Sequence, residues 1–244
     1  MRQETLDRLI EAREAKRGAA LLRWLGSGRE ALVVDGEVVL GEVPAPALDA
    51  VADAFRRDKG ATLQTDDGPL FIQVFNPPLR LMVVGAVHIA QALVPIASLT
   101  GYDVTVIDPR RAFASDARFP GVDVRQDWPD EALEELRPDA RTAVVTLTHD
   151  PKLDDPALDV ALRSDAFYIA ALGSRRTHAA RRERLAALGH DAAGMDRIHG
   201  PAGLSLGAVS PAEIAIAVMA EMTQALRQPG REPSTAAASS GKAA

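Results

Sequence analysis

The stretch that decides the fold is Arg80–Arg110, RLMVVGAVHIAQALVPIASLTGYDVTVIDPR. Residues 81–84 are all apolar, which is typical of a strand covered on both faces of a parallel sheet. A turn at Gly85 leads into a helical apolar pattern over 88–99, and a second apolar run follows over 102–107. Strand, turn, helix and strand in this order predict a βαβ unit.

The turn of this unit departs from the dinucleotide-binding fingerprint G-x-G-x-x-G/A. Gly85 and Ala90 supply the first and last small residues, but Val87 replaces the glycine that lets the backbone approach a pyrophosphate. Asp108 follows Gly85 at the spacing, about 20 residues, that the fingerprint has for its ribose ligand. A Rossmann-like fold is therefore expected, whereas NAD(P) in the usual pose is disfavoured because a β-branched side chain obstructs it. The alternative is a turn that is tight for packing alone.

Composition limits the classes of function. An apolar fraction of 47% in 244 residues is ample for the core of one large or two modest domains. The net charge of −6 gives no basic surface, so no nucleic acid is expected as a partner. No apolar run is long enough to span a membrane and the charged N-terminus is unlike a signal peptide, so a cytoplasmic protein is expected. The absence of cysteine excludes disulfides, thiolate nucleophiles and thiolate metal ligands.

Residues 1–76 are expected to form a small α+β domain. Its expected elements are helices over 5–16 and 47–57 and strands over 19–25, 31–35, 37–40, 61–64 and 70–75. Asp35-Gly36 signals a hairpin between two of these strands, and Asp66-Asp67-Gly68 joins two others. Asn76-Pro77-Pro78 is a stiff connector to the next domain.

Residues 79–227 continue the alternation of strand and helix. Further helices are expected over 130–136, 156–162, 175–188 and 211–227, and strands over 142–147 and 166–171. This order predicts an α/β fold, a Rossmann-like parallel sheet with helices on both faces. Residues 228–244 are rich in Pro, Gly, Ser and Ala and are predicted to be a disordered tail.

Polar side chains gather where the predicted strands end, which is where open parallel sheets bind ligands. The candidate cofactor-binding residues are Gly85, His88, Asp108, Arg110, Thr148, His149, Asp150, Gly173, Ser174, Arg175 and Arg176. Ser174 can cap a helix whose free N–H groups attract anions, and the two arginines after it add bidentate recognition of phosphate. No second histidine lies at metal-ligand spacing from His149, so no metal site and no catalytic residue is assigned.

Each of these clusters has a structural alternative. The two arginines could begin a solvated helix face, residues 148–150 could cap a turn, and His88 could pack at a helix start. Residues 197–204 form a Gly/Pro-rich loop, which indicates close approach to a ligand or partner subunit, or an ordinary connector. His178 and His190 are expected at the surface.

Five segments, in order, resemble the Rossmann domain of the xanthine dehydrogenase accessory protein family, also called the XdhC/CoxI family. They are LMVVGAVHIAQAL, VTVIDPRRAFA with RFPG, TLTHDPKLDDPAL, FYIAALGSRRTHAARRERL and RIHGPAGLSLGAVSPAEIAIAVMAEM, within residues 79–226. The resemblance implies a chaperone that binds molybdenum cofactor (molybdopterin), supports its sulfuration and inserts it into an apo xanthine dehydrogenase-type molybdenum enzyme. A sulfur-donating desulfurase is then a second expected partner.

The N-terminal region departs from longer family members, which carry a Gly/Ser/Pro/Arg-rich motif and a glycine–cysteine motif there. Neither is present, so the cofactor would have to be held through its pterin and phosphate rather than by a protein thiolate. Two other functions remain open from the residues. One is an NAD(P)-dependent oxidoreductase with a degenerate Rossmann fingerprint, and the other is a sensor or adaptor with a vestigial Rossmann domain.

The last predicted helix, 211–227, is apolar enough for a homodimer contact, which is expected. Its large apolar residues are Ile214, Ile216, Val218, Met219 and Met222. Burial against the chain's own sheet would explain the same pattern.

Overall fold

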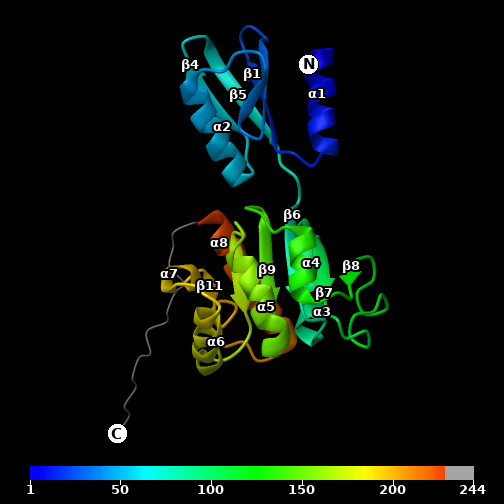
Figure 1. Ribbon diagram of the computed structural model, residues 1–244. Helices are drawn as coiled ribbons and strands as arrows, with labels where there is room; N and C mark the ends of the chain where they lie inside the picture. The colour runs from blue at the N-terminus through cyan, green and yellow to red at the C-terminus, as the bar shows by residue number, and fades with distance from the viewer. Residues whose placement is uncertain (229–244) are drawn as a thin grey trace. The chain divides into compact units, whose positions relative to one another are not determined.

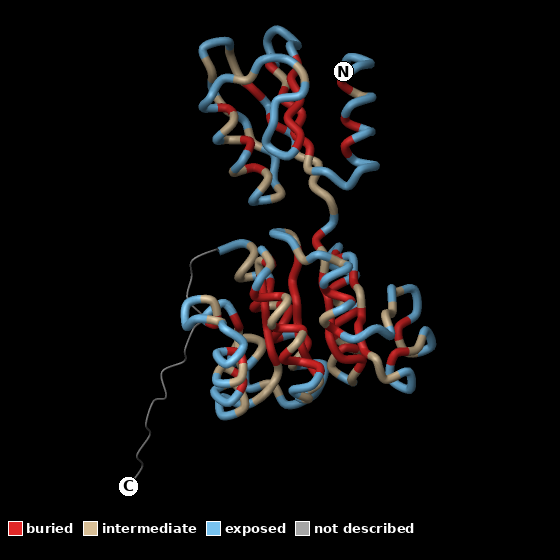
Figure 2. Tube along the Cα trace, in the orientation of Figure 1, coloured by how far each residue is buried: buried red, intermediate tan, exposed pale blue. Residues whose placement is uncertain are grey.

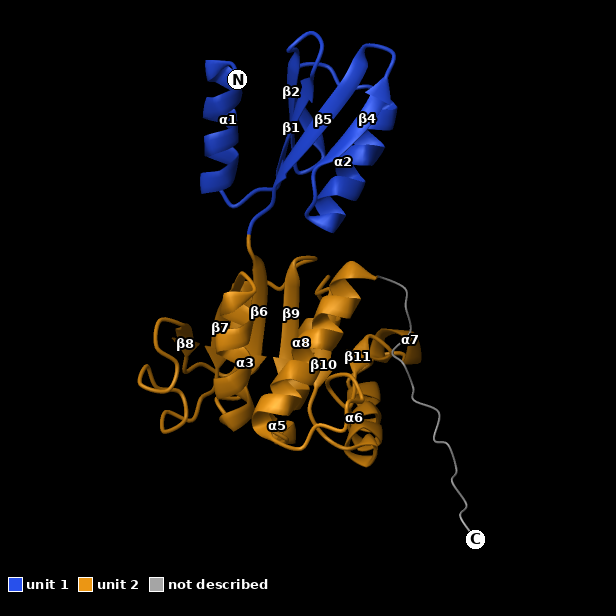
Figure 3. Ribbon diagram, turned by 180° about the vertical axis from the view of Figure 1, so that it is seen from behind, with its two compact units in different colours: residues 1–77 blue, residues 78–244 orange. Residues whose placement is uncertain are grey.

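The computed structural model describes residues 1–228, which form two compact units that divide after Pro77 (Figures 1 and 3). Except for Gln228, the predicted tail over 228–244 lies outside the described residues. Among the described helices, none has both the length and the apolar character needed to cross a membrane.

The N-terminal unit is an antiparallel five-stranded sheet in the order β3-β2-β1-β5-β4, with two helices. Its elements are α1 (Gln3–Glu14), β1 (Ala19–Trp24), β2 (Glu30–Val34), β3 (Glu37–Leu40), α2 (Ala45–Arg57), β4 (Ala61–Thr65) and β5 (Gly68–Phe75). Leu22, Trp24 and Ile72 of the sheet pack with Val51 of α2 in one core cluster. The two predicted strand pairs form as hairpins, so the expected α+β module is confirmed.

The second unit is a six-stranded parallel sheet in the order β11-β10-β9-β6-β7-β8. Its elements are β6 (Leu79–Val84), α3 (His88–Leu99), β7 (Tyr102–Ile107), β8 (Asp123–Arg125), α4 (Pro129–Leu136), β9 (Thr142–Thr146), α5 (Pro151–Leu162), β10 (Tyr168–Ala171), α6 (Arg175–Ala187), α7 (Ala192–Met195), β11 (Ile198–His199) and α8 (Pro211–Arg227). This architecture confirms the predicted Rossmann-like fold.

Helices cover both faces of this sheet, because alternate residues of its buried strands face opposite ways. Leu81 and Val83 of β6 join a cluster with α3 and α8, whereas Met82 and Val84 join a second cluster with α4 and α5. Figure 2 shows the buried residues as bands along these strands. The wholly apolar run at 81–84 is the sequence signal of this two-sided burial.

Two features differ from the sequence-based expectations, and a third supports one of the stated alternatives. Helix α5 begins at Pro151 rather than 156, because the Asp150 side chain caps it by accepting a hydrogen bond from the Lys152 N–H. The short elements β8, α7 and β11 were not predicted, because two to four residues carry no periodicity. In α8, Val218, Met219 and Met222 pack into the unit's own core, which explains most of its apolar pattern. The homodimer stays a prediction.

The turn after β6 requires glycine. Gly85 has φ +110°, and a Cβ there would lie 2.6 Å from Cγ2 of Thr148. Thr148 cannot turn aside freely, since its hydroxyl donates a 2.7 Å hydrogen bond to Asp154. The turns that follow β6 and β9 are therefore in direct contact.

Gly85→Ala should destabilise this unit by more than backbone strain alone. Strain at positive φ costs about 1–2 kcal/mol, and overpacking against Thr148 should add about 1–3 kcal/mol. Gly101→Ala is the matched control, because Gly101 has φ +89° and no atom within 4 Å of its added Cβ. Amide hydrogen exchange in β6 and β9 measures the loss of stability in this unit alone. Equal losses of stability in the two variants would contradict the close contact between Gly85 and Thr148.

Candidate functional site

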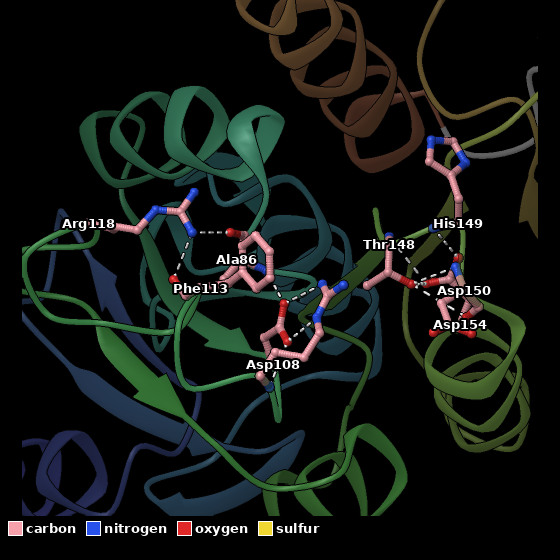
Figure 4. A network of polar contacts seen from close by, with 9 residues as sticks. Ala86, Asp108, Phe113, Arg118, Thr148, His149, Asp150 and Asp154 are labelled. Carbon is pink, nitrogen blue, oxygen red and sulfur yellow. Dashed lines mark hydrogen bonds and ion pairs between the residues drawn. The ribbon is translucent and has the colours of Figure 1, made fainter.

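Asp108, at the end of β7, has its carboxylate engaged in hydrogen bonds within the protein. Asp108 is fully buried, and its carboxylate accepts a 2.8 Å hydrogen bond from the N–H of Ala86. The guanidinium of Arg110 donates two more, at 2.9 and 2.7 Å, as Figure 4 shows in part. Burial raises the pKa of the Asp108 carboxyl, but these hydrogen bonds outweigh it and hold the pKa below its usual value. The residue in the ribose-binding position is therefore engaged within the turn.

The segment after β7 also covers the first turn. The guanidinium of Arg118 donates to the carbonyl oxygens of Ala86 and Phe113, at 2.8 and 2.9 Å. Its other nitrogen donates to the Gln91 side chain on α3 at 2.9 Å. Both peptide groups of Ala86 are thus used internally, in the turn where a dinucleotide-binding domain meets its pyrophosphate. His88, the first residue of α3, is exposed beside this turn.

The turn after β9 is held by a buried carboxylate. Asp154 is 1% exposed and accepts hydrogen bonds from the Thr148 hydroxyl at 2.7 Å and the His149 N–H at 3.1 Å. Burial raises the pKa of Asp154 despite these bonds. His149 has φ +62°, a conformation uncommon outside glycine that clusters at functional sites. Its imidazole is exposed and points away from Asp154 (Figure 4).

Arg181 links the turn after β9 to the turn after β10. It is 1% exposed, donates a 2.9 Å hydrogen bond to the carbonyl of Leu172, and lies 3.8 Å from Asp154. Burial lowers the pKa of its guanidinium. Sequence reasoning missed this role, because Arg181 is one of several arginines in a helix assigned to a solvated face.

The turn after β10 opens onto a cavity. Ser174 caps α6 as expected, accepting a 3.1 Å hydrogen bond from the Thr177 N–H. The cavity beside it has a volume of about 670 Å³ and is bounded by α6, α8 and the loop from β11. Its walls include Gly173 and Arg175, whereas Arg176 does not line it. The Gly/Pro-rich loop predicted as a connector or contact segment thus forms a cavity wall.

A buried glutamate stands at the α8 side of this cavity. Glu221 is 5% exposed, and its Oε2 accepts hydrogen bonds from the Tyr168 hydroxyl at 2.6 Å and the Gly203 N–H at 2.8 Å. Its Oε1 lies 3.2 Å from Nδ1 of His199, whose ring lies 4.7 Å from that of Tyr168 and is tilted by 40° to it. Burial raises the pKa of Glu221, but His199 and Tyr168 outweigh it and lower the pKa overall. The carboxylate is therefore ionised near neutral pH.

Sequence analysis missed this glutamate because it treated 211–227 as a uniformly apolar helix. The available signal was Glu221 itself, an acid at a position whose helical neighbours are buried.

The expectation that His178 and His190 lie at the surface is wrong. His178 is half-buried in the cavity wall and packs directly against Gly200, so burial lowers the pKa of its imidazole. His190 forms a 2.7 Å hydrogen bond with Asp159 on α5. Helix α6 has a low share of apolar residues, which concealed that one of its faces packs inward.

The predicted site residues thus fall into two groups. Gly85, Asp108 and Arg110 belong to the covered first turn. Gly173 and Arg175 line the cavity. Thr148 lies against Gly85 of the first group, and its hydrogen bond to Asp154 links it through Arg181 to the turn after β10. Within residues 1–228, no group of three or more His, Asp or Glu side chains is arranged to hold a metal ion.

A family model described as the XdhC Rossmann domain matches residues 81–222. The molybdenum cofactor insertion chaperone PaoD of Escherichia coli (strain K12) is 33% identical over 148 residues, which are 61% of this chain and 40% of PaoD. A probable xanthine dehydrogenase subunit from Bacillus subtilis (strain 168) is 33% identical over 156 residues, 64% of this chain and 45% of that protein. The chain spans less than half the length of these curated relatives.

In structure, the chain is similar to a crystal structure of a xanthine dehydrogenase from Bacillus halodurans. The TM-score is 0.71 at 24% identity, with 92% of this chain and 67% of that chain covered, which shows a shared fold. The family model covers more than half of the sequence and includes the turns after β6, β7, β9 and β10. The chain therefore belongs to the XdhC family.

Proposed function

We propose that this chain is an accessory protein that binds molybdenum cofactor, supports its sulfuration and inserts it into a xanthine dehydrogenase-type molybdenum enzyme. The observation that carries the proposal is the family match over 81–222, supported by the relative named a molybdenum cofactor insertion chaperone. The proposal includes an apo molybdenum enzyme as client, a desulfurase as sulfur donor, and a homodimeric state.

The residues present suit the pterin and the phosphate of such a cofactor. A cavity of about 670 Å³ falls within the range of small-molecule sites, about 300–1,000 Å³. Arg175 and the start of α6 offer a positive end for a phosphate. Because the chain has no cysteine, the protein would hold the pterin and phosphate and leave the metal to the cofactor's own ligands.

The cofactor-binding residues proposed from the strand ends differ in how free they are to meet a ligand. Gly173 and Arg175 line the cavity with Ser174 between them in the chain, and His149 offers an exposed imidazole. The remaining members act through other residues or at the rim of the site; they are Gly85, His88, Asp108, Arg110, Thr148, Asp150 and Arg176.

An NAD(P)-dependent oxidoreductase receives no support from the first turn. A ribose hydroxyl would need the Asp108 carboxylate, which already accepts hydrogen bonds from Ala86 and Arg110. Val87 adds the steric obstruction expected from the sequence.

The function is tested by reconstituting a cofactor-free molybdenum hydroxylase with and without this protein. We expect a higher fraction of loaded active sites when the protein is present, because a carrier protects and delivers the cofactor. Equal loading in both reactions would contradict the proposed function.

Arg175→Ala should weaken cofactor retention while leaving the fold intact, since Arg175 is exposed at the cavity mouth. Losing one charge-assisted contact costs about 1.5–3 kcal/mol, or roughly ten- to more than a hundredfold in affinity. Arg8→Ala is the control, with the same charge change at an exposed residue of α1 in the other unit. Arg184 is unsuitable as a control because it pairs with Asp155 of α5. Equal cofactor retention by the two variants would place the anion site elsewhere.

The Asp108 contacts predict a pH dependence of stability. Because the folded state lowers the pKa of Asp108, its contribution is fully present above the unfolded pKa near 4 and is lost as pH falls through the folded pKa. Asp108→Asn should therefore lower the unfolding free energy at pH 7 and flatten its fall below pH 4. Asp123→Asn, which removes a half-exposed surface ion pair, is the control. Amide hydrogen exchange in β6 and β7 measures the unfolding free energy of both variants as a function of pH. If Asp108→Asn lost stability below pH 4 as steeply as the wild type, the Asp108 contacts would not be the cause of that loss.

A further inference from the structure

We propose that the cavity between α6 and α8 binds the 2-amino-4-oxopyrimidine edge of a pterin, with Glu221 accepting a hydrogen bond from its 2-amino group and Arg175 binding its anionic substituent. This inference rests on the proposed function and deepens it, because it assigns the two ends of the ligand to two sides of one cavity. It also moves the ligand away from the first turn of the Rossmann unit.

The cavity is built by close backbone approach. Gly203 has φ +92°, and a Cβ there would lie 2.9–3.0 Å from backbone and side-chain atoms of Ala217 and Val218 on α8. Gly200 lies directly against the His178 ring on α6. The loop after β11 is thus held against both helices, and the space that remains between them is the cavity.

Glu221 has acceptor capacity left for a ligand. A carboxylate offers about four acceptor positions. Tyr168 and Gly203 use two on Oε2, and His199 faces one on Oε1, so one position on Oε1 remains in a residue that lines the cavity. An ionised carboxylate only accepts hydrogen bonds, so a matching ligand must present N–H donors.

The three neighbours of Glu221 hold it in place for this role. Two hydrogen bonds fix Oε2, and the His199 ring, which packs against Tyr168 at an interplanar angle of 40°, faces Oε1. A carboxylate fixed in this way selects for donor geometry, because hydrogen bonds to a charged group in a buried site are strong and directional.

Charge complementarity sets the ligand class. Glu221 on one wall requires a donor edge, and Arg175 at the start of α6 requires an anion. A planar ring bearing an amino-pyrimidinone edge and an anionic arm meets both requirements. Guanine nucleotides share this edge, so the experiment must separate a pterin from a guanine nucleotide.

The test compares ligands that differ only at the 2-amino group. Binding of 6-carboxypterin and 6-carboxylumazine, in which an oxygen replaces that amino group, is followed by ligand fluorescence on the full chain. Wild type should prefer the pterin by tenfold or more, because a carbonyl oxygen facing Glu221 is repelled. Glu221→Gln should reduce the preference to within about threefold.

Glu135→Gln is the control, being the same substitution at an exposed position of α4, and it should keep the wild-type preference. If Glu221→Gln does not fold, Ile214→Trp serves instead, because it fills the cavity from the half-buried wall and should abolish pterin binding. GMP and XMP form the guanine arm, and a preference confined to this pair would overturn the pterin assignment.

Absence of discrimination in wild type, or its persistence in Glu221→Gln, would also overturn the inference. Measuring how much molybdenum cofactor the same wild-type sample retains separates a failure of the cavity assignment from a failure of the proposed function. Cofactor retained without pterin discrimination defeats only the assignment of the cavity, whereas loss of retention and of hydroxylase loading defeats the proposed function.

Discussion

The contact between the Asp108 carboxylate and the N–H of Ala86 determines how this Rossmann unit can be used. It places a buried charge directly beneath the turn after β6, where a dinucleotide would be recognised. A buried carboxylate is tolerated when it is paired and hydrogen-bonded, and Arg110 supplies both kinds of contact to Asp108. The carboxylate of Asp108 and the turn are therefore bonded to each other, which leaves this carboxylate no free acceptor position for a ligand.

The next strand ends are coupled by charge as well. Asp154 fixes the backbone of Thr148 and His149, and Arg181 joins Asp154 to the carbonyl of Leu172. Both ions are almost fully buried, so removing either would leave the other without compensation. The turn after β9, where His149 has its positive φ, is consequently joined to α6 and to the end of β10 by one buried pair of charges.

The sequence was informative where a physical rule acts locally. The apolar run at 81–84, Gly85 and the Ser210–Pro211 helix start each express a nearest-neighbour constraint, and the structure has β6, its turn and α8 as expected. Long-range pairings carry no such signal. Nothing near Glu221 in the sequence indicates Tyr168 or Gly203, and the acid that meets Arg181 lies on another helix. The cavity could therefore not be predicted from the sequence, although its loop, its arginine and its glycines are each recognisable there.

Asp108 and Glu221 differ in the acceptor capacity that each leaves for a ligand. Both are buried carboxylates that accept a backbone N–H, from Ala86 and Gly203 respectively. Asp108 is saturated by an adjacent arginine on its own loop, whereas Glu221 is flanked by a tyrosine and a histidine that leave one acceptor position unused. The four acceptor positions of Asp108 are therefore filled, whereas one position of Glu221 is not. The carboxylate with acceptor capacity to spare thus lies on the β10 side of the sheet, where α6, α8 and the glycine loop enclose the cavity.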